Sequence, residues 1–191
     1  MLTSQMKNTT FIVALLLSVF IMQSCKKSDV DTATSDNTTP AVFSAFINDT
    51  SWTPTTYNAG IAYTMATKNK VISWTATLGK QQVNLAITQK NAGNGNGFPT
   101  GIFTVDTTSR VVLSYALQNS ANVFVPQGTV RPGSGSIAIT AIDSVKMVIT
   151  GTFSFNTIKY TYDSQGNITS LFVNNINSGS FNSMPYKYAK Q

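Results

Sequence analysis

The stretch VKMVITGTFSFN, residues 145–156, alternates apolar and polar side chains along its whole length. One face carries Val145, Met147, Ile149, Gly151, Phe153 and Phe155. The other carries Lys146, Thr150, Thr152, Ser154 and Asn156. A period of two is typical of a β-strand with one buried face. Gly151 falls in phase with the apolar face, which indicates a bend, a bulge or the close approach of a large neighbouring side chain. A long bent strand of this kind is what a barrel or a tightly coiled sandwich requires.

The same period recurs on both sides of this stretch. It is found in residues 71–78, 81–89, 111–117 and 137–141. Turn-forming residues separate the runs: Gly79-Lys80 predicts a tight hairpin, and 91–97, 163–167 and 174–179 are also expected to be turns. No segment has the pattern of an amphipathic helix. We therefore predict an all-β fold, a single antiparallel meander of about ten strands, closed as a barrel or folded as a sandwich.

The N-terminus has the pattern of a lipoprotein signal. Lys7 precedes an apolar run from Phe11 to Met22, and Ser24 then precedes Cys25, the chain's only cysteine. The run is shorter than the roughly 20 residues a membrane-spanning helix needs. An ordinary secretory signal would have the same basic and apolar regions, but it would not need a lone cysteine directly after them. We predict cleavage before Cys25 and a diacylglycerol on its thiol.

This interpretation divides the chain into three parts. Residues 1–24 are the signal peptide, 25–40 are the lipidated cysteine with a polar tether, and 41–191 are the all-β domain. Stable anchoring takes two acyl chains, and a diacylglyceryl group supplies both. The predicted location is the outer membrane. The sequence does not decide between its periplasmic and cell-surface sides, because Lys26 and Lys27 precede the acidic Asp29 and Asp31.

The composition argues against an enzyme. The chain has no histidine and no glutamate, and charged residues make up only 10 % of it. The usual base near neutral pH is therefore missing, and transition-metal sites lack most of their ligands. We expect no cofactor and no metal. The net charge of +6 comes from scattered lysines and arginines without the clustering of a nucleic-acid face, so no nucleic-acid partner is expected.

The aspartates beyond residue 41 follow apolar runs and stand beside Asn, Thr or Ser, as side chains that cap their own turns do. They are Asp49, Asp106, Asp143 and Asp163. A hydrolase with a non-standard site would need two of them, or a lysine and a serine, brought close together.

Several elements together resemble a family of uncharacterised lipoproteins from Bacteroidota. They are Phe46-Ile47-Asn48-Asp49 with Trp52, Gly101 to Val105, Gly135 to Thr140 with Asp143, Ile149 to Phe155, and Ile176 to Phe181 ending at Met184-Pro185-Tyr186. The resemblance covers roughly Ala41 to Tyr186. It implies an all-β domain on a lipid anchor, and it implies no activity.

Two kinds of candidate site remain. Tyr160 with Tyr162, and Tyr186 with Tyr188, each lie beside a lysine and are candidates for an exposed aromatic platform. Thr32, Thr107 and Ser144 each follow an aspartate and precede a small or apolar residue or a threonine, so they are candidates for O-glycosylation.

We therefore expect a non-enzymatic binding or structural module of the cell envelope. It is held on the membrane by Cys25, and the candidate partners are a glycan, a lipid or an envelope protein. A lipocalin-like carrier of a small lipid or glycan is the sharper alternative, and it requires a closed barrel with an interior cavity. A hydrolase is the other alternative.

Overall fold

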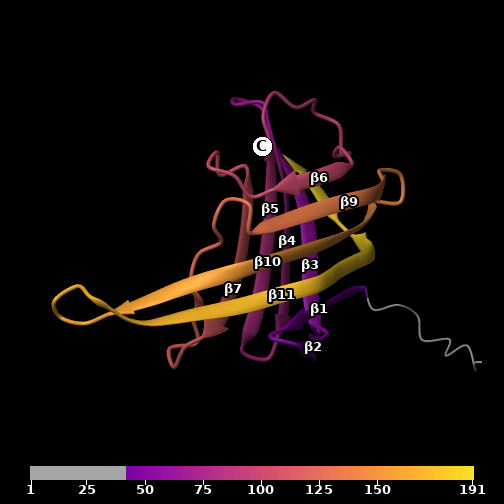
Figure 1. Ribbon diagram of the computed structural model, residues 1–191. Coiled ribbons are helices and arrows are strands. Elements are labelled where there is room, and N and C mark those ends of the chain that lie inside the picture. Colours follow the sequence, from indigo (N-terminus) through magenta and orange to yellow (C-terminus); the bar gives the residue numbers. More distant parts are fainter. Residues whose placement is uncertain (1–41) are drawn as a thin grey trace, which may run out of the picture. The chain divides into compact units, whose positions relative to one another are not determined.

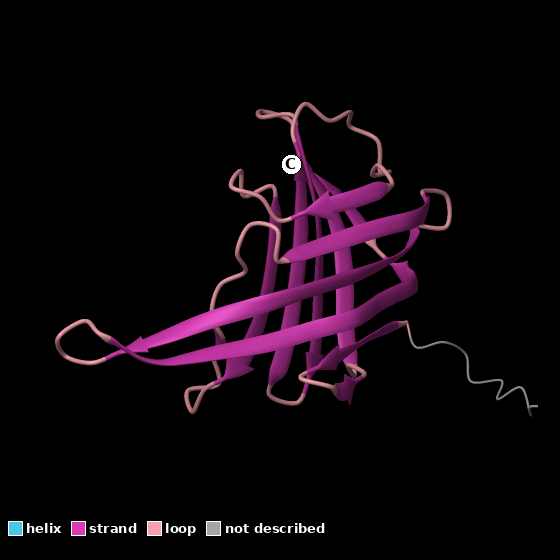
Figure 2. Cartoon of the chain, viewed as in Figure 1, coloured by secondary structure: helices cyan, strands magenta, loops and turns pink. Residues whose placement is uncertain are grey.

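The computed structural model describes residues 42–191, which form strands and no helix (Figures 1 and 2). The strands make two six-stranded sheets. Sheet 1 has the order β2 (Thr50–Trp52), β1 (Phe43–Ile47), β11 (Ile168–Pro185), β10 (Val148–Tyr162), β9 (Gly135–Asp143), β6 (Gly101–Thr104). Sheet 2 has the order β12 (Lys187–Lys190), β3 (Thr56–Thr64), β4 (Asn69–Leu78), β5 (Gln81–Gln89), β7 (Val111–Gln118), β8 (Phe124–Pro126). The all-β prediction is confirmed.

The two sheets form a sandwich and not a closed barrel, since each is open with two edge strands. Apolar side chains from both inner faces make one buried cluster that includes Phe43, Trp74, Phe153 and Phe181. The barrel alternative is therefore wrong, and the lipocalin-like carrier loses the closed interior on which it depended.

The single meander is also wrong, although β3, β4 and β5 do follow one another as antiparallel neighbours. The short β6 leaves this run to pair with β9 in the other sheet. At the C-terminus β12 returns to pair in parallel with β3. These departures divide the strands between two sheets, which bury each other's apolar faces.

Gly151 accounts for the packing at the centre of sheet 1. A Cβ built on it would lie 2.2 Å from the carbonyl oxygen of Ala138 and 2.5 Å from Cζ of Phe181. The ladders that join β10 to β9 and β11 both shift register beside this residue. The predicted close approach at Gly151 is therefore confirmed, and the bulges lie opposite it, on β9 and β11.

The strand predicted over residues 145–156 begins and ends later in the structure. Val145 is 92 % exposed, because Asp143 Oδ1 accepts hydrogen bonds from the backbone N–H groups of Val145 and Lys146 and closes a turn there. β10 starts at Val148 and continues past Asn156 to Tyr162. Residues 174–179, predicted as a turn, lie inside β11 beside a register shift.

β10 and β11 form a long hairpin whose far end projects from the sandwich, drawn in orange and yellow in Figure 1. Residues 163–167 form its turn, as predicted. Asp163 Oδ1 accepts hydrogen bonds from the backbone N–H groups of Gln165 and Asn167. No helix within residues 42–191 could cross a membrane.

Candidate binding face

The outer face of sheet 1 carries short uncharged polar side chains. Along β10, Phe153 and Phe155 are buried against sheet 2, and the alternate residues Ser154 and Asn156 are exposed. This follows from strand geometry, in which successive side chains point to opposite faces. The neighbouring strands extend the face with Ser136 and Ala138 on β9, Thr104 on β6, and Asn177, Ser178 and Ser180 on β11.

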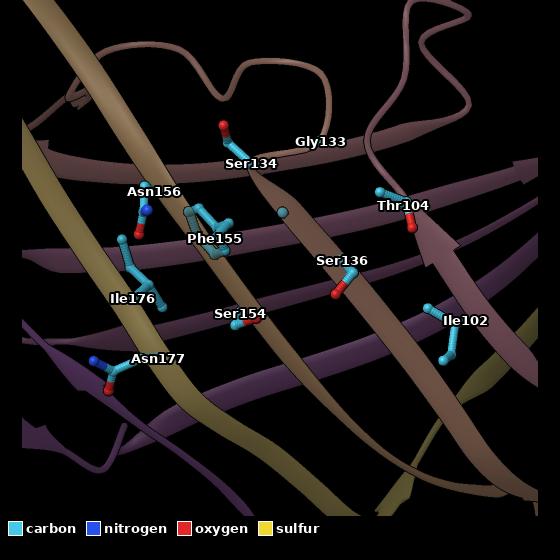
Figure 3. A pocket seen from close by; sticks show the side chains of 11 residues that line it. Ile102, Thr104, Gly133, Ser134, Ser136, Ser154, Phe155, Asn156, Ile176 and Asn177 are labelled. Carbon is cyan, nitrogen blue, oxygen red and sulfur yellow. The ribbon is translucent and has the colours of Figure 1, made fainter.

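This outer face is hollowed at two adjoining places. The first hollow has a volume of about 360 Å³. In Figure 3 Ser136 and Ser154 lie between Thr104 and Ile102 on one side and Asn156 and Asn177 on the other. The second hollow, of about 290 Å³, shares Ser136 and Ser154 and continues toward Thr152, Ser178 and Ser180. The two hollows thus form one shallow groove across the strands, which we call the polar groove.

The polar groups of the groove are available to a ligand. Within residues 42–191 the side chains of Ser136, Ser154, Asn156 and Asn177 make no hydrogen bond to another part of the chain. Of the described residues that line the two hollows, none is charged. Hydroxyl and amide groups can both donate and accept, so the groove suits a neutral ligand that is rich in hydroxyl groups.

Tyr160 and Tyr162 stand farther along the same face of β10. Their ring centroids are 6.4 Å apart with the planes inclined at 38°, and Tyr162 is 60 % exposed. The guanidinium carbon of Arg131 lies 5.7 Å from the centroid of the Tyr160 ring, and its Nη2 donates to the Tyr160 hydroxyl. The structure thus brings this predicted pair together on an exposed surface and places a cation against one ring.

Tyr186 and Tyr188 do not form such a platform, and that prediction is wrong. Tyr186 is only 4 % exposed, and its hydroxyl donates to the carbonyl oxygen of Asn96 at 3.0 Å. The half-buried Tyr188 donates to the carbonyl oxygen of Asn94. Burial, with a smaller contribution from the charge of Asp143, raises the pKa of Tyr186. Both tyrosines hold the glycine-rich loop 91–97 and do not face a ligand.

Lys70 contributes to the same loop. Its side chain is directed inward from β4, and Nζ donates to the carbonyl oxygen of Gly97 at 2.9 Å. Burial lowers the pKa of this lysine. The loop leads into β6 and not into a helix, so it lacks the helix N-terminus on which a phosphate cradle depends.

Of the four aspartates predicted to cap turns, three do so in the structure. Asp106 accepts from the backbone and hydroxyl of Thr108, Asp143 from the backbone after it, and Asp163 from Asn167. The hydrogen bond from the Thr108 hydroxyl is the main cause that lowers the pKa of Asp106. The hydrogen bond from the backbone N–H of Lys146 is the main cause that lowers the pKa of Asp143. The hydrogen bond from the Asn167 side chain is the main cause that lowers the pKa of Asp163. The described residues include no cluster of three or more His, Cys, Asp or Glu that could hold a metal.

Of the predicted modification sites, two lie within the described residues 42–191 and two lie outside them. Thr107 and Ser144 are exposed at turns, where they are accessible. Cys25 and Thr32 lie outside the described residues, so lipid attachment and the first glycosylation site stay predictions. No sequence motif marks the groove residues Ser136, Ser154, Asn156 and Asn177. They belong to the polar half of the strand pattern, which is typical of any solvent-facing side of a sheet.

The fold and this face define an open β-sandwich domain whose outer sheet surface is uncharged and rich in hydroxyl and amide groups. The chain belongs to the family described as a domain of unknown function (DUF6252), which matches residues 39–185. No curated protein matches the chain, and no solved structure does. The matched range agrees with the range of the resemblance seen in the sequence, and membership carries no activity with it.

Proposed function

We propose that this protein is a lipid-anchored, non-enzymatic binding module of the cell envelope that holds a neutral glycan in the polar groove. The observation that carries the proposal is the uncharged polar groove on sheet 1, with free Ser and Asn side chains at its centre. Farther along β10 stand the half-buried Tyr160, with Arg131 against its ring, and the exposed Tyr162. Cys25 would supply the anchor, and residues 26–40 would form the tether.

A glycan fits this face better than the other partners considered. Its hydroxyl groups both donate and accept, which matches the serine hydroxyls and asparagine amides of the groove. The apolar face of a sugar ring could cover an exposed aromatic ring such as that of Tyr162, which combines an apolar body with a polar end. An anionic ligand would find no positive charge among the lining residues that the structure describes.

The dimensions favour an extended chain over a single sugar. From Thr152 to Tyr162 the face follows ten residues of β10, a span of about 33 Å at the rise of a strand. The hollows are shallow, so each subsite would contribute a few hydrogen bonds. A net contribution of about 0.5–1.5 kcal/mol per bond predicts modest affinity from several weak contacts.

Affinity electrophoresis in gels that contain neutral polysaccharides tests the proposal. The panel is laminarin, mannan, xyloglucan and dextran. We expect at least one to retard the protein. Asn177→Ala should weaken the retardation about 2–10-fold, the range of one lost hydrogen bond, and Tyr162→Ala should weaken it through the loss of the aromatic ring.

Asn58→Ala is the matched control, because Asn58 is an exposed asparagine on sheet 2. It should bind as the wild type does. The proposal fails if no member of the panel retards the protein. It also fails if Asn58→Ala weakens binding as much as Asn177→Ala.

A further inference from the structure

The far part of the β10–β11 hairpin is paired only with itself for most of its length. β9 pairs with β10 only as far as Phe155, and β1 pairs with β11 only from Ile176 onward. Beyond these points Ile158 is opposite Val173, and Tyr160 is opposite Leu171. One isolated bridge, from Thr129 to Ile158, touches the β10 edge. Figure 1 shows this part of the hairpin extending beyond the other strands of both sheets.

The backbone of β11 leaves an open edge there. The N–H of Asn48 donates to the carbonyl oxygen of Asn175 at 2.9 Å, and the N–H of Asn175 donates to Asn48 Oδ1 at 2.9 Å. The backbone groups of Asn175 therefore point away from β10. Because this direction alternates along a strand, those of Val173 and Leu171 point the same way. Within residues 42–191 no strand pairs with this edge beyond Asn175.

The side chains along this edge are apolar on both faces. Leu171 and Val173 are 55 % and 47 % exposed on the outer face, and Phe172 is 55 % exposed on the inner face. Ile168, farther along the same edge, is 59 % exposed. An open strand edge with apolar side chains is a template for a further strand. The five residues of the turn, 163–167, are exposed and polar, which disfavours insertion of the tip into a lipid bilayer.

Charge indicates which partner fits this edge. The chain as a whole carries a net charge of +6, so two copies repel each other over most of their surface. Residues 158–173 contain one cation, Lys159, and one anion, Asp163. The cation of Arg131 also lies against Tyr160, on the β10 side of the hairpin, whereas residues 168–175 along the open edge of β11 carry no charge. Two copies can therefore approach at this edge with little electrostatic repulsion.

We propose that two copies of this chain pair through the open edges of β11, antiparallel and around a twofold axis. The axis passes beside Leu171, so that Leu171 is opposite Leu171 of the partner subunit and Val173 is opposite Thr169 of the partner subunit. This register uses the outward backbone groups of Leu171 and Val173 and stops short of Asn175, which Asn48 already occupies. It joins sheet 1 of both copies edge to edge.

The size of the interface predicts a weak dimer. The four exposed apolar side chains of β11, Ile168, Leu171, Phe172 and Val173, bury on the order of 100 Å² each, since a whole aromatic side chain offers about 150–250 Å². The total for both copies is then roughly 800 Å², which is smaller than a stable interface and fits a weak, transient one. We expect a dissociation constant of about 10–500 micromolar, as for other small interfaces.

Sedimentation velocity of the complete chain in a density-matched detergent tests the dimer, over a concentration series from about 5 to 500 micromolar chosen to bracket that weak range. Val173→Pro removes an outward N–H and leaves the ladder to β10 intact, because the inward donors there are Phe172 and Asn174. Leu171→Lys adds a charge at the axis. The matched control is Val112→Lys, since Val112 is 52 % exposed on sheet 2.

The wild type and Val112→Lys should shift from monomer to dimer across the series, and both hairpin variants should weaken the association at least tenfold. A wild type that stays monomeric throughout overturns the proposal. So does a dimer that Leu171→Lys and Val173→Pro leave unchanged. Amide hydrogen exchange with and without phosphatidylethanolamine vesicles gives a third outcome. If the protein stays monomeric and the hairpin amides are protected only when the vesicles are present, the hairpin binds lipid and the dimer proposal is overturned. None of these results depends on glycan binding.

Discussion

Replacing Gly151 with alanine should destabilise the domain, although the change adds only one methyl group. A Cβ at this position would lie 2.2 Å from the backbone oxygen of Ala138 and within 2.7 Å of two ring carbons of Phe181. Phe181 is fully buried and packs on Trp74, with ring centroids 5.0 Å apart. Neither the carbonyl group nor the ring can move without displacing the core.

The expected cost is about 3 kcal/mol in the free energy of unfolding, the upper part of the range for overpacking a core. For a chain of this size that lowers Tm by about 6–12 °C. Urea denaturation followed by tryptophan fluorescence measures it, because Trp74 reports directly on this region. Without the clash, a change from glycine to alanine would stabilise the fold by about 0.4–1 kcal/mol, because it restricts the unfolded chain. The sign of the change in the free energy of unfolding is therefore informative by itself.

Gly95→Ala is the control, because a Cβ there would have no heavy atom within 4 Å. It should leave stability unchanged or raise it slightly. If Gly151→Ala unfolds at the same urea concentration as Gly95→Ala, the packing of Phe181 over Gly151 is refuted.

Three further predictions follow from the signal, the turns and the glycine-rich loop. Cys25→Ser should abolish labelling by radioactive fatty acid in the native host, and retained label would remove the lipid anchor from the account. Asn167→Ala should raise the pKa of Asp163 toward its ordinary value, measured by NMR titration of the carboxyl carbon, because the Asn167 amide is the main cause of the depression; an unchanged titration would contradict this cause. A carboxyl group whose pKa is lower in the folded state stabilises the fold at any pH above its unfolded pKa of about 3.9. This stabilisation is lost as the pH falls through the folded pKa. The contribution of Asp163 to stability should therefore decrease only in acid. Tyr186→Phe should cost about 1 kcal/mol, the usual contribution of one hydrogen bond, and should speed amide exchange in residues 91–97; an unaltered exchange rate would show that the bond to Asn96 does not hold the loop.

The strands whose two faces differ most in polarity could be predicted from the sequence alone. In β4 and β5 the alternation is regular and the Gly79-Lys80 turn is short, so local chemistry defines the hairpin. The sequence was insufficient where a local signal competes with long-range pairing. Residues 174–179 have the composition of a turn, yet they form part of β11 because β1 and β10 both supply partners from distant parts of the chain.

The candidate site was predicted only in part for the same reason. Tyr160 and Tyr162 are two residues apart on one strand, so their common face follows from the period alone. Tyr186 and Tyr188 have the same spacing, but loop 91–97, far away in sequence, covers them. The polar groove joins side chains from β6, β9, β10 and β11, and no local pattern indicates that order of strands.

The most direct test of the proposed binding face is an amide NMR titration with a polysaccharide that retards the protein in the gel. The account predicts that the largest shifts occur at Ser136, Ser154, Asn156 and Asn177 and extend along β10 to Tyr162. Shifts confined to sheet 2, or to the loop 91–97, would contradict it and remove the groove as the binding site.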